Sequence, residues 1–337
     1  MNKLKLKVGV IGLGVGERHA DVYAADPRCE LVSICDLNLE KLESVGQKYN
    51  SPVLTTDARD ILTNSSIDLV SIASFDNFHC EQILLAIENN KHIFVEKPLC
   101  LHDSEFEQIS ISLKDKTNIK ISSNLVLRTA PHFLKVKEKI DSGYFGKLYY
   151  FEGDYNYGRI QKIISSWRGQ IPFYSVTHGG AIHLIDLILW LSQEKITEVI
   201  AVGNKISTSA SEFKYPDMVT ALLKFSNGMT AKISANFGCM MPHHHGLSVF
   251  GSEASYVKSF ATEKYYTSRN STFMPEEFNY EEKFRKDDIL KSFVSSILEG
   301  SEPLVSLIDV FNAMSVSLAI ERSLKSLNWE KVSYLNS

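Results

Sequence analysis

The sequence predicts two domains: an α/β domain with a doubly wound parallel sheet over residues 1–123, and an α+β domain with a large, mostly antiparallel open sheet over residues 124–337. Three observations lead to this prediction. Short apolar runs alternate with helical stretches through the first third of the chain, which is typical of a parallel sheet. A glycine-rich turn follows the first apolar run. Farther along, an Asn-Gly pair separates two runs of alternating polarity, which indicates a β-hairpin.

The elements of the first domain follow from its apolar runs and from the residues that interrupt them. Residues 7–12 predict a buried strand, and residues 17–25 predict a helix that ends before Pro27. Further strands are expected at residues 30–35, 67–73, 92–95 and 119–124. Helices are expected between them at residues 39–49, 77–90 and 103–114. A sheet of this kind has its ligand sites at the carboxyl ends of its strands.

A glycine-rich turn at Gly12, Gly14, Val15 and Gly16 joins the first strand to the first helix. Glycines at such a turn let the backbone approach a pyrophosphate, and the helix N-terminus offers free N–H groups and a favourable dipole. The turn departs from the usual dinucleotide fingerprint, because its third glycine position holds Glu17 and the small residue comes one place earlier, at Gly16. A purely structural glycine turn is the alternative interpretation.

Asp36 ends the second predicted strand. An acidic residue ~20 residues beyond the glycines is expected to bind the hydroxyl groups of the adenosine ribose. Its charge would repel a 2′-phosphate, and the next arginine, Arg59, is distant in sequence, so NAD is favoured over NADP. The alternative is that Asp36 caps the helix that follows it.

Polar residues follow the carboxyl ends of three later strands: Ser74, then Glu96 and Lys97, then Asn124. Lys97 comes directly after an apolar run and before Pro98, so it is expected at the sheet edge where a nicotinamide would lie. A lysine can accept the proton of an alcohol when burial or nearby positive charge lowers its pKa. We therefore interpret Lys97 as an acid/base; a solvated surface lysine is the alternative.

Several motifs carry a family resemblance. They are the glycine turn with RHA at residues 18–20, DNFH at 76–79, KHIFVEKP at 91–98, Arg128, DSGYFGKL at 141–148 and HLID at 183–186. In these motifs the chain resembles the Gfo/Idh/MocA family of glucose-fructose oxidoreductase and inositol dehydrogenase, over nearly its whole length. The resemblance implies that Lys97 contacts the nicotinamide ribose and the substrate hydroxyl, and that His183 completes the catalytic site. The residues expected to contact the cofactor are Gly12, Gly14, Val15, Gly16, Asp36, Ser74, His79, Glu96 and Lys97.

Two departures from the family pattern bear on the substrate and on the direction of the reaction. An aspartate usually precedes the family histidine by four residues, but Gly179 stands there, and Ala181 stands two residues before His183. His178 is a neighbour that could partly replace the aspartate. The proline of the family's Thr-Pro-Asn turn is Phe75 here.

The second domain begins with a helix expected at residues 128–141 and a strand at 147–157. Residues 217–225 and 229–237 alternate in polarity on either side of Asn227-Gly228, which predicts an antiparallel hairpin. Helices are expected at residues 180–191 and 307–325, and the last is expected to pack back near the first domain. The resemblance implies that such a sheet pairs between subunits, which would give a homodimer or a homotetramer.

Polar and aromatic residues of the second domain are candidates for substrate binding, because arginines and aromatic rings bind sugars and phosphates. The candidates are Asn124, Arg128, Tyr155, Trp167, Arg168, His178 and Asp186, and Tyr157 and Arg159 lie in the same stretch. An ordinary loop or core role is the alternative for each, and also for His183. Residues 243–245 are three histidines, but neighbouring side chains on an extended segment alternate between faces, so no metal site is expected.

The 337-residue chain has a net charge of −4 and no basic stripe, which argues against nucleic acid as a partner. No apolar run is long enough to span a membrane, and the first run is expected to be a strand rather than a signal peptide. Five cysteines without a C-x-x-C pair favour buried thiols in a reducing cytoplasm. A cytoplasmic protein with a small-molecule substrate is therefore expected.

These observations favour an NAD-dependent oxidoreductase that transfers a hydride to or from a secondary alcohol or ketone of a sugar, a cyclitol or a nucleotide-linked sugar. Two alternatives stay open. One is an NAD-dependent glycosidase that oxidises its substrate transiently and would cleave sugars without net NADH. The other is a non-catalytic NAD-binding sensor of the same fold. Gly179 in place of the family aspartate favours the sensor, whereas the intact Glu-Lys-Pro favours an enzyme.

Overall fold

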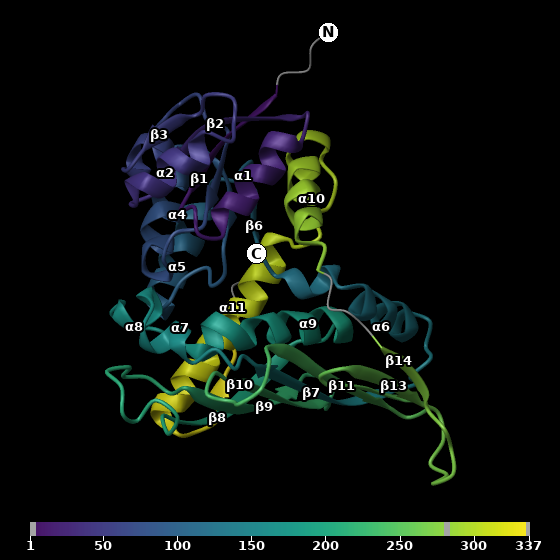
Figure 1. Cartoon of the computed structure of the whole chain (residues 1–337). Helices are drawn as coiled ribbons and strands as arrows, with labels where there is room; N and C mark the ends of the chain where they lie inside the picture. Colours follow the sequence, from purple (N-terminus) through teal and green to yellow (C-terminus); the bar gives the residue numbers. More distant parts are fainter. Residues whose placement is uncertain (1–4, 280–283, 335–337) are drawn as a thin grey trace. The chain divides into compact units, whose positions relative to one another are not determined.

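The computed structural model describes residues 5–279 and 284–334 and separates the chain into two compact units (Figure 1). The first unit comprises Met1–Asn124 and Arg285–Val310, and the second comprises Leu125–Phe284 and Phe311–Ser337. The sequence predicted a single boundary at residues 123–124 and assigned every later residue to the second domain. The structure has a boundary at that place, but it groups residues 285–310 with the first unit.

The first unit contains a six-stranded sheet in the order β3-β2-β1-β4-β5-β6, and all neighbouring strands are parallel. The strands are β1 (Leu6–Ile11), β2 (Cys29–Cys35), β3 (Val53–Thr55), β4 (Leu69–Ile72), β5 (His92–Val95) and β6 (Ile121–Ser123). Every residue of β4 and β6 is buried, because crossover helices cover both faces of a parallel sheet. The strand order reverses between β1 and β4, so the predicted doubly wound sheet is confirmed.

Helices connect these strands. They are α1 (Gly16–Ala25), α2 (Leu39–Gly46), α3 (Ala58–Leu62), α4 (His79–Glu88) with the short η1 (Asp76–Phe78) before it, and α5 (Asp103–Leu113). The predicted helices at residues 39–49 and 77–90 are shorter in the structure. The sequence did not predict β3 or α3, which are three and five residues long and therefore too short to show a periodic apolar pattern.

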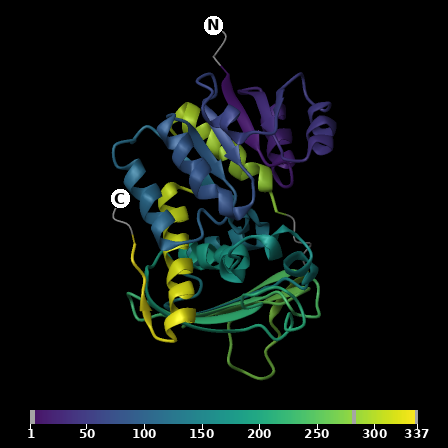
Figure 2. The ribbon, with the colours of Figure 1, turned by 90° about the vertical axis from the view of Figure 1, so that its left-hand side faces the viewer.

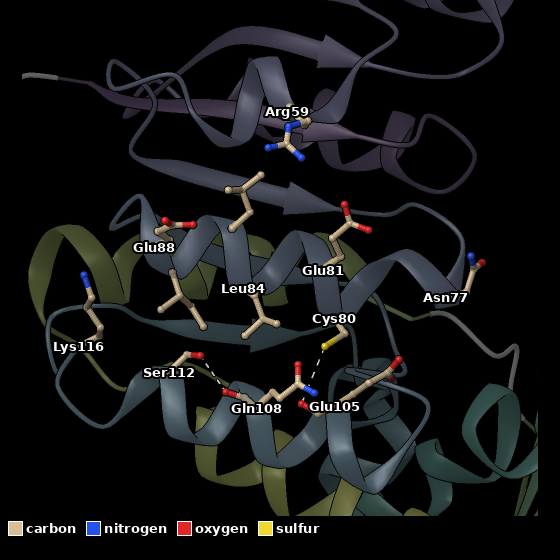
Figure 3. A pocket seen from close by; sticks show the side chains of 12 residues that line it. Arg59, Asn77, Cys80, Glu81, Leu84, Glu88, Glu105, Gln108, Ser112 and Lys116 are labelled. Carbon is tan, nitrogen blue, oxygen red and sulfur yellow. Dashed lines mark hydrogen bonds between the residues drawn. The ribbon is translucent and has the colours of Figure 1, made fainter.

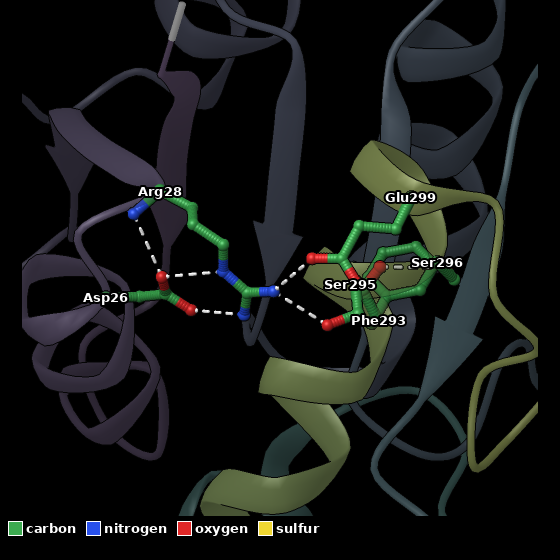
Figure 4. Close-up of polar contacts among 6 residues, drawn as sticks. All are labelled: Asp26, Arg28, Phe293, Ser295, Ser296 and Glu299. Atoms are coloured by element: carbon green, nitrogen blue, oxygen red, sulfur yellow. Dashed lines mark hydrogen bonds and ion pairs between the residues drawn. The ribbon is translucent and has the colours of Figure 1, made fainter. Parts of the chain in front are cut away.

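Helix α10 (Lys286–Glu299) belongs to the first unit although it lies far along the chain. Figure 4 shows how Arg28, in the turn before β2, links to it. Arg28 donates Nε and Nη2 to the two carboxylate oxygens of Asp26, at 2.9 and 2.7 Å. Its Nη1 donates to the Ser295 hydroxyl at 2.7 Å and to the Glu299 carboxylate at 3.0 Å. No helix was predicted at this place.

The segment that contains α10 also completes the core of the first unit. Phe293 lies against Phe94 of β5 with ring centroids 5.8 Å apart, and neither ring is exposed to solvent. The Ser122 hydroxyl of β6 donates to the carbonyl oxygen of Val305 at 2.8 Å. Residues 285–310 therefore contribute buried side chains, such as Phe293 and Val305, to this unit's core.

The second unit contains a nine-stranded sheet in the order β14-β13-β12-β11-β7-β10-β9-β8-β15. The strands are β7 (Leu148–Asn156), β8 (Ile196–Asn204), β9 (Met218–Phe225), β10 (Thr230–Asn236), β11 (His244–Gly251), β12 (Ser255–Lys258), β13 (Thr262–Tyr266), β14 (Glu276–Asn279) and β15 (Glu330–Lys331). Among the described pairings of this sheet, β7 with β10 is parallel and the others are antiparallel, so the mostly antiparallel sheet is confirmed. The predicted hairpin is β9–β10, whose turn contains Gly228 at φ = +89°.

The helices of the second unit are η2 (Val126–Thr129), α6 (Pro131–Asp141), α7 (Gln161–Ile164), α8 (Trp167–Gln170), the π-helical turn η3 (Thr177–Ala181), α9 (Ile182–Ser192) and α11 (Leu307–Ser326), which belongs to this unit from Phe311 onward. Figures 1 and 2 show α6 and α9 along one face of the sheet, and no described helix on its other face. The predicted helix at 128–141 begins only at Pro131, because a 3₁₀ turn precedes it. The predicted helix at 180–191 begins with the π-helical turn.

Four of the five cysteines are buried and Cys239 is half-exposed, and all five are free thiols. Burial raises the pKa of Cys29 and of Cys35 to about 12. The expectation of buried thiols is thus confirmed for four cysteines and wrong for Cys239. Within residues 5–279 and 284–334, no helix has both the length and the apolar character that crossing a membrane requires.

Candidate active site

The glycine turn between β1 and α1 is shaped by two close approaches to the strand-end residue Ala73. Gly12 has φ = +83°, and a Cβ there would lie 2.4 Å from the carbonyl oxygen of Ala73. A Cβ on Gly16 would lie 3.1 Å from side-chain atoms of both Ala73 and Val10. Gly16 therefore allows α1 to lie close to the sheet, which is the role of the third glycine in a dinucleotide fingerprint. The departure at Glu17 leaves this packing intact.

Gly14, in the middle of the turn, has open space beside it. No described atom outside its immediate neighbours lies within 4 Å of the place where its Cβ would stand. The next residue, Val15, is the N-cap of α1 and makes no side-chain cap hydrogen bond, so the first N–H groups of the helix are available to a ligand. A phosphate group fits such a place. The turn therefore suits the pyrophosphate of a dinucleotide.

Asp36 stands at the end of β2, beside the same turn. Its Oδ2 accepts a hydrogen bond from the backbone N–H of Leu13 at 2.7 Å, and its Oδ1 accepts one from that of Asn38 at 2.8 Å. The cap of α2 is Asn38, whose side chain accepts from the N–H of Lys41, so the alternative role of Asp36 as the helix cap is wrong. A carboxylate has about four acceptor sites, which leaves acceptors for the ribose hydroxyls of a dinucleotide.

Glu96, directly after β5, is held by residues of two other segments. His19 of α1 has its Nε2 3.3 Å from the Glu96 Oε1, and Asn124 donates Nδ2 to the same oxygen at 2.6 Å. The other ring nitrogen of His19 lies 2.9 Å from the Ser71 hydroxyl. Burial alone would raise the pKa of Glu96, but the hydrogen bond with His19 and the charge of Lys97 outweigh it and lower this pKa to about 2. Glu96 is therefore a carboxylate at neutral pH.

The contacts of Glu96 revise the sequence analysis at two positions. His19 was not among the predicted site residues, although it lies in the RHA motif at residues 18–20. Asn124 was predicted to bind the substrate, whereas in the structure its side-chain amide donates to Glu96.

Lys97 follows β5 and is half-buried rather than fully solvated, and its peptide bond to Pro98 is cis. The fully buried His79 of α4 has its Nδ1 2.6 Å from the carbonyl oxygen of Pro98 and its Nε2 3.2 Å from that of Ser74. The Ser74 hydroxyl donates to Gln82 at 2.7 Å. His79, which was predicted to contact the cofactor, thus joins the segments that follow β4 and β5 and positions the backbone next to Lys97.

His183 lies in the first turn of α9, just after the π-helical turn η3. Turns of this kind occur frequently at functional sites. His183 is buried and stacks on Tyr155 of β7 with ring centroids 6.4 Å apart. His178, inside η3, is also buried, and its Nδ1 lies 2.7 Å from the Ser317 hydroxyl of α11. The two histidines therefore have different surroundings: His183 faces aromatic rings, and His178 faces α11.

The space of a side chain at position 179 is filled by Tyr174. A Cβ on Gly179 would lie 2.2 Å from the hydroxyl oxygen of Tyr174, which is 1% exposed. Residue 179 must therefore be glycine unless Tyr174 moves. The position at which the family pattern has a carboxylate is in this way occupied by a tyrosine hydroxyl.

Arg128 and Asp186, both predicted to bind the substrate, bind each other. Arg128 donates Nε and Nη2 to the two Asp186 oxygens at 2.9 and 2.6 Å, and the two side chains are 5% and 1% exposed. Bidentate geometry of this kind gives a strong, directional pair. The pair joins η2 to α9 and thereby holds the helix that carries His183.

Tyr155 is the centre of a cluster of aromatic rings. The rings of His243 and His245 lie 5.1 and 5.2 Å from it, whereas His244 points to the other side of the sheet, toward Phe260. Burial raises the pKa of Tyr155 well above its usual range. Among the described residues, no group of three or more His, Cys, Asp or Glu side chains is arranged to hold a metal ion.

Trp167 and Arg168 are adjacent in α8. The guanidinium carbon of Arg168 lies 4.4 Å from the centroid of the Trp167 ring. The predicted residues thus form separate local groups within each unit. They are the glycine turn with Asp36, Ser74 with His79, Glu96 with Asn124, Arg128 with Asp186, His183 with Tyr155, and Trp167 with Arg168.

A hollow of about 850 Å³ lies between α4 and α5 of the first unit (Figure 3). Its lining includes Arg59, Glu81, Glu88, Glu105 and Lys116, so charges of both signs surround it. None of the predicted site residues lines it. We therefore do not assign the function to this hollow.

Two family models match the chain. Residues 6–124 match the oxidoreductase family with an NAD-binding Rossmann fold, and residues 133–257 match the GFO/IDH/MocA C-terminal domain. Together the two matches span most of both units.

Several dehydrogenases are similar to this chain along most of its length. The scyllo-inositol 2-dehydrogenase (NAD(+)) of Bacillus subtilis is 26% identical over 96% of this chain and 95% of its own length. The levoglucosan dehydrogenase of Pseudarthrobacter phenanthrenivorans is 25% identical over 86% of this chain and 77% of its own length. A solved structure of levoglucosan dehydrogenase with NADH and levoglucosan has a TM-score of 0.84 at 24% identity, covering 98% of this chain and 100% of that one.

Proposed function

The chain belongs to the Gfo/Idh/MocA family of NAD-binding oxidoreductases, and we propose that it transfers a hydride between NAD and a secondary alcohol or ketone of a sugar, a cyclitol or a nucleotide-linked sugar. The observation that carries this proposal is the position of Glu96 and Lys97 directly after β5. Strand β5 belongs to the same sheet as β1, and the turn between β1 and α1 suits a dinucleotide. The names of the relatives, an inositol dehydrogenase and a levoglucosan dehydrogenase, support the substrate class.

We assign the cofactor site to the glycine turn and Asp36. Gly12, Gly14 and Gly16 would hold the pyrophosphate at the N-terminus of α1, and Asp36 would accept hydrogen bonds from the adenosine ribose. The charge of Asp36 disfavours a 2′-phosphate, so NAD is preferred to NADP. When bound, NAD supplies the carbon centre that accepts or returns the hydride.

We assign the acid/base role to Lys97. In the oxidising direction its Nζ takes the proton of the substrate hydroxyl as the hydride leaves the adjacent carbon, and in the reducing direction it returns the proton. Contacts of the residues on either side of Lys97 support its placement at the end of β5. Glu96, before it, is held by His19 and Asn124, and Pro98, after it, is held by His79.

We assign a second role to His183, which would form a hydrogen bond with the reacting oxygen of the substrate. The family resemblance supports this role. Within the second unit, Tyr155 stacks on the imidazole and the Arg128–Asp186 pair holds α9, so the position of His183 in this unit is well supported. His178 contacts α11 and is assigned no part in the reaction.

The test is the absorbance at 340 nm after the protein is mixed with NAD+ and a panel of sugars, inositols and nucleotide-linked sugars. A rise with one class identifies the substrate class. Lys97→Met should lower kcat by about 10²–10⁴-fold, while a fluorescence titration with NADH shows retained binding. Lys114→Met, at an exposed position after α5, is the matched control.

Three other results would contradict parts of this proposal. Unchanged turnover in Lys97→Met would remove Lys97 from the mechanism. Sugar cleavage without accumulation of NADH would favour the glycosidase. NADH binding without turnover on any compound would favour the sensor.

A further inference from the structure

Two stretches of the second unit carry positive charge and no acidic residue. Residues 155–185 contain Arg159, Lys162 and Arg168 but no aspartate or glutamate, and residues 218–252 contain no acidic residue either. The chain as a whole has a net charge of −4. These stretches are therefore positively charged in a protein whose net charge is negative.

Arg159 is linked to His183 through stacked rings. Its guanidinium carbon lies 5.4 Å from the centroid of Tyr157. The ring of Tyr157 stacks on that of Tyr155 at 5.7 Å, and Tyr155 stacks on His183 at 6.4 Å. Arg159 itself is exposed. A positive charge thus stands two rings away from the histidine assigned to the reaction.

Arg168 reaches the same aromatic cluster from α8. It lies over Trp167 at 4.4 Å, and Trp167 meets Tyr174 edge-on at 6.4 Å. Tyr174 in turn meets Phe237 at 6.3 Å, and Phe237 stacks on Tyr155 at 5.7 Å. Both arginines therefore border the aromatic cluster around Tyr155. Burial raises the pKa of the Tyr155 hydroxyl, and the charges of Arg168 and Arg159 oppose this rise.

Neither Arg159 nor Arg168 forms an ion pair with an acidic residue in the part of the chain that the structure describes. Arg18, Arg28 and Arg128, in contrast, each bind a carboxylate. A guanidinium group presents five donors in a planar fork that matches a carboxylate or a phosphate. Two such forks beside aromatic rings, in a stretch of sequence without acidic residues, are suited to a ligand that combines a ring with an anionic group.

We propose that Arg159 and Arg168 bind a carboxylate or phosphate group of the substrate while Tyr157 contacts its ring. This inference rests on the proposed function and narrows its substrate class to acidic derivatives of sugars or cyclitols. The two arginines hold a part of the substrate that does not react. Their loss therefore raises KM more than it lowers kcat, and NADH binding is unchanged.

The test compares neutral and anionic probes that share a ring. The pairs are D-glucose with D-glucuronate, D-glucose with D-glucose 6-phosphate, and myo-inositol with myo-inositol monophosphate. We measure kcat/KM at 340 nm with the full chain, and we also measure the thermal shift that each probe causes in the NADH-loaded protein. We expect a preference of about tenfold or more for the anionic member of at least one pair. The carboxylate and phosphate probes show which group is bound, and added salt should weaken the preference.

Three variants test the two arginines. Arg159→Gln and Arg168→Gln should each lower kcat/KM for the preferred anionic probe about tenfold and leave the neutral probe nearly unaffected. Lys162→Gln is the matched control, because it removes a positive charge from the same stretch at an exposed position of α7. Equal kcat/KM and equal thermal shifts within every pair, or equal effects of the three substitutions, would overturn the inference and leave the proposed function intact. Absence of NADH binding would instead contradict the proposed function.

Discussion

Gly179 and Tyr174 show how the identity of one residue depends on another. The Tyr174 hydroxyl stands 2.2 Å from the place of a Cβ at position 179, so any side chain fits there only if Tyr174 moves. A comparison of motifs alone records a missing aspartate, whereas the structure shows that Tyr174 takes up the space in which a side chain at position 179 would begin.

Glu96 predicts how stability depends on pH. Its pKa in the folded chain is about 2, below the ordinary 4.5. The carboxylate therefore stabilises the fold above about pH 4.5, and this contribution is lost as the pH falls toward 2. We expect urea titrations to show a larger difference in unfolding free energy between the parent protein and Glu96→Gln at pH 6 than at pH 3, by about 2 kcal/mol. Glu40→Gln, at an exposed position on α2, should show the same difference at both pH values; equal behaviour of the two variants would contradict the role of Glu96.

At the scale of elements, two arginines link α10 to the start of the chain, and they predict different effects. Arg28→Ala removes its bonds to Ser295 and Glu299 and leaves Asp26, with a 5% exposed side chain, without its guanidinium partner. We expect a loss of about 1–3 kcal/mol in the free energy of unfolding, measured by urea denaturation.

Arg18→Ala is the matched control for this prediction. Arg18 binds Asp287 of α10 at 2.7 Å, but its side chain is 60% exposed, and exposed pairs contribute at most about 1 kcal/mol. A loss for Arg18→Ala as large as that for Arg28→Ala would contradict the assignment of Arg28 as the main link.

The elements that the sequence predicted well have local signals. The strand at residues 92–95 is found with the predicted bounds, and the β9–β10 hairpin follows from the glycine in its turn. No local sequence pattern could assign helix α10 to the first unit. Its contact with the rest of the unit joins Ser295 to Arg28, and these residues are 267 positions apart in the sequence. In strands β12 and β13, charged residues such as Lys258 and Glu263 stand opposite each other. These charges weaken the apolar alternation from which a strand is predicted.

The same distinction applies to the candidate site. The glycine turn is contiguous in sequence, and Asp36 follows it at a characteristic distance, so both were predictable. The contact of His19 with Glu96 and the contact of Tyr174 with position 179 depend on how the chain folds back on itself. The pairing of Arg128 with Asp186 was hidden for the same reason, since 58 residues separate them.

At the scale of the whole molecule, the second sheet has one face that α6 and α9 do not cover. Leu222 and Val202 on that face are 49% and 63% exposed, and Tyr150 stacks on Phe250 on the far side of β10. We expect this face to pair two copies of the chain. Leu222→Glu should then shift the mass measured by light scattering from oligomer to monomer. Met274→Glu changes an equally apolar exposed residue outside the sheet and should have no such effect; a monomeric parent protein would contradict the prediction.

The return of α10 to the first unit has a consequence for the synthesis of the protein. Phe94 and Arg28 leave the ribosome early, but Phe293 and Ser295, which cover and bind them, follow only after residues 125–284 of the second unit have been made. At about 5–20 residues per second, those roughly 200 intervening residues leave β5 uncovered for on the order of 10–40 s. A nascent chain must therefore keep an unfinished first unit soluble while it builds most of the second.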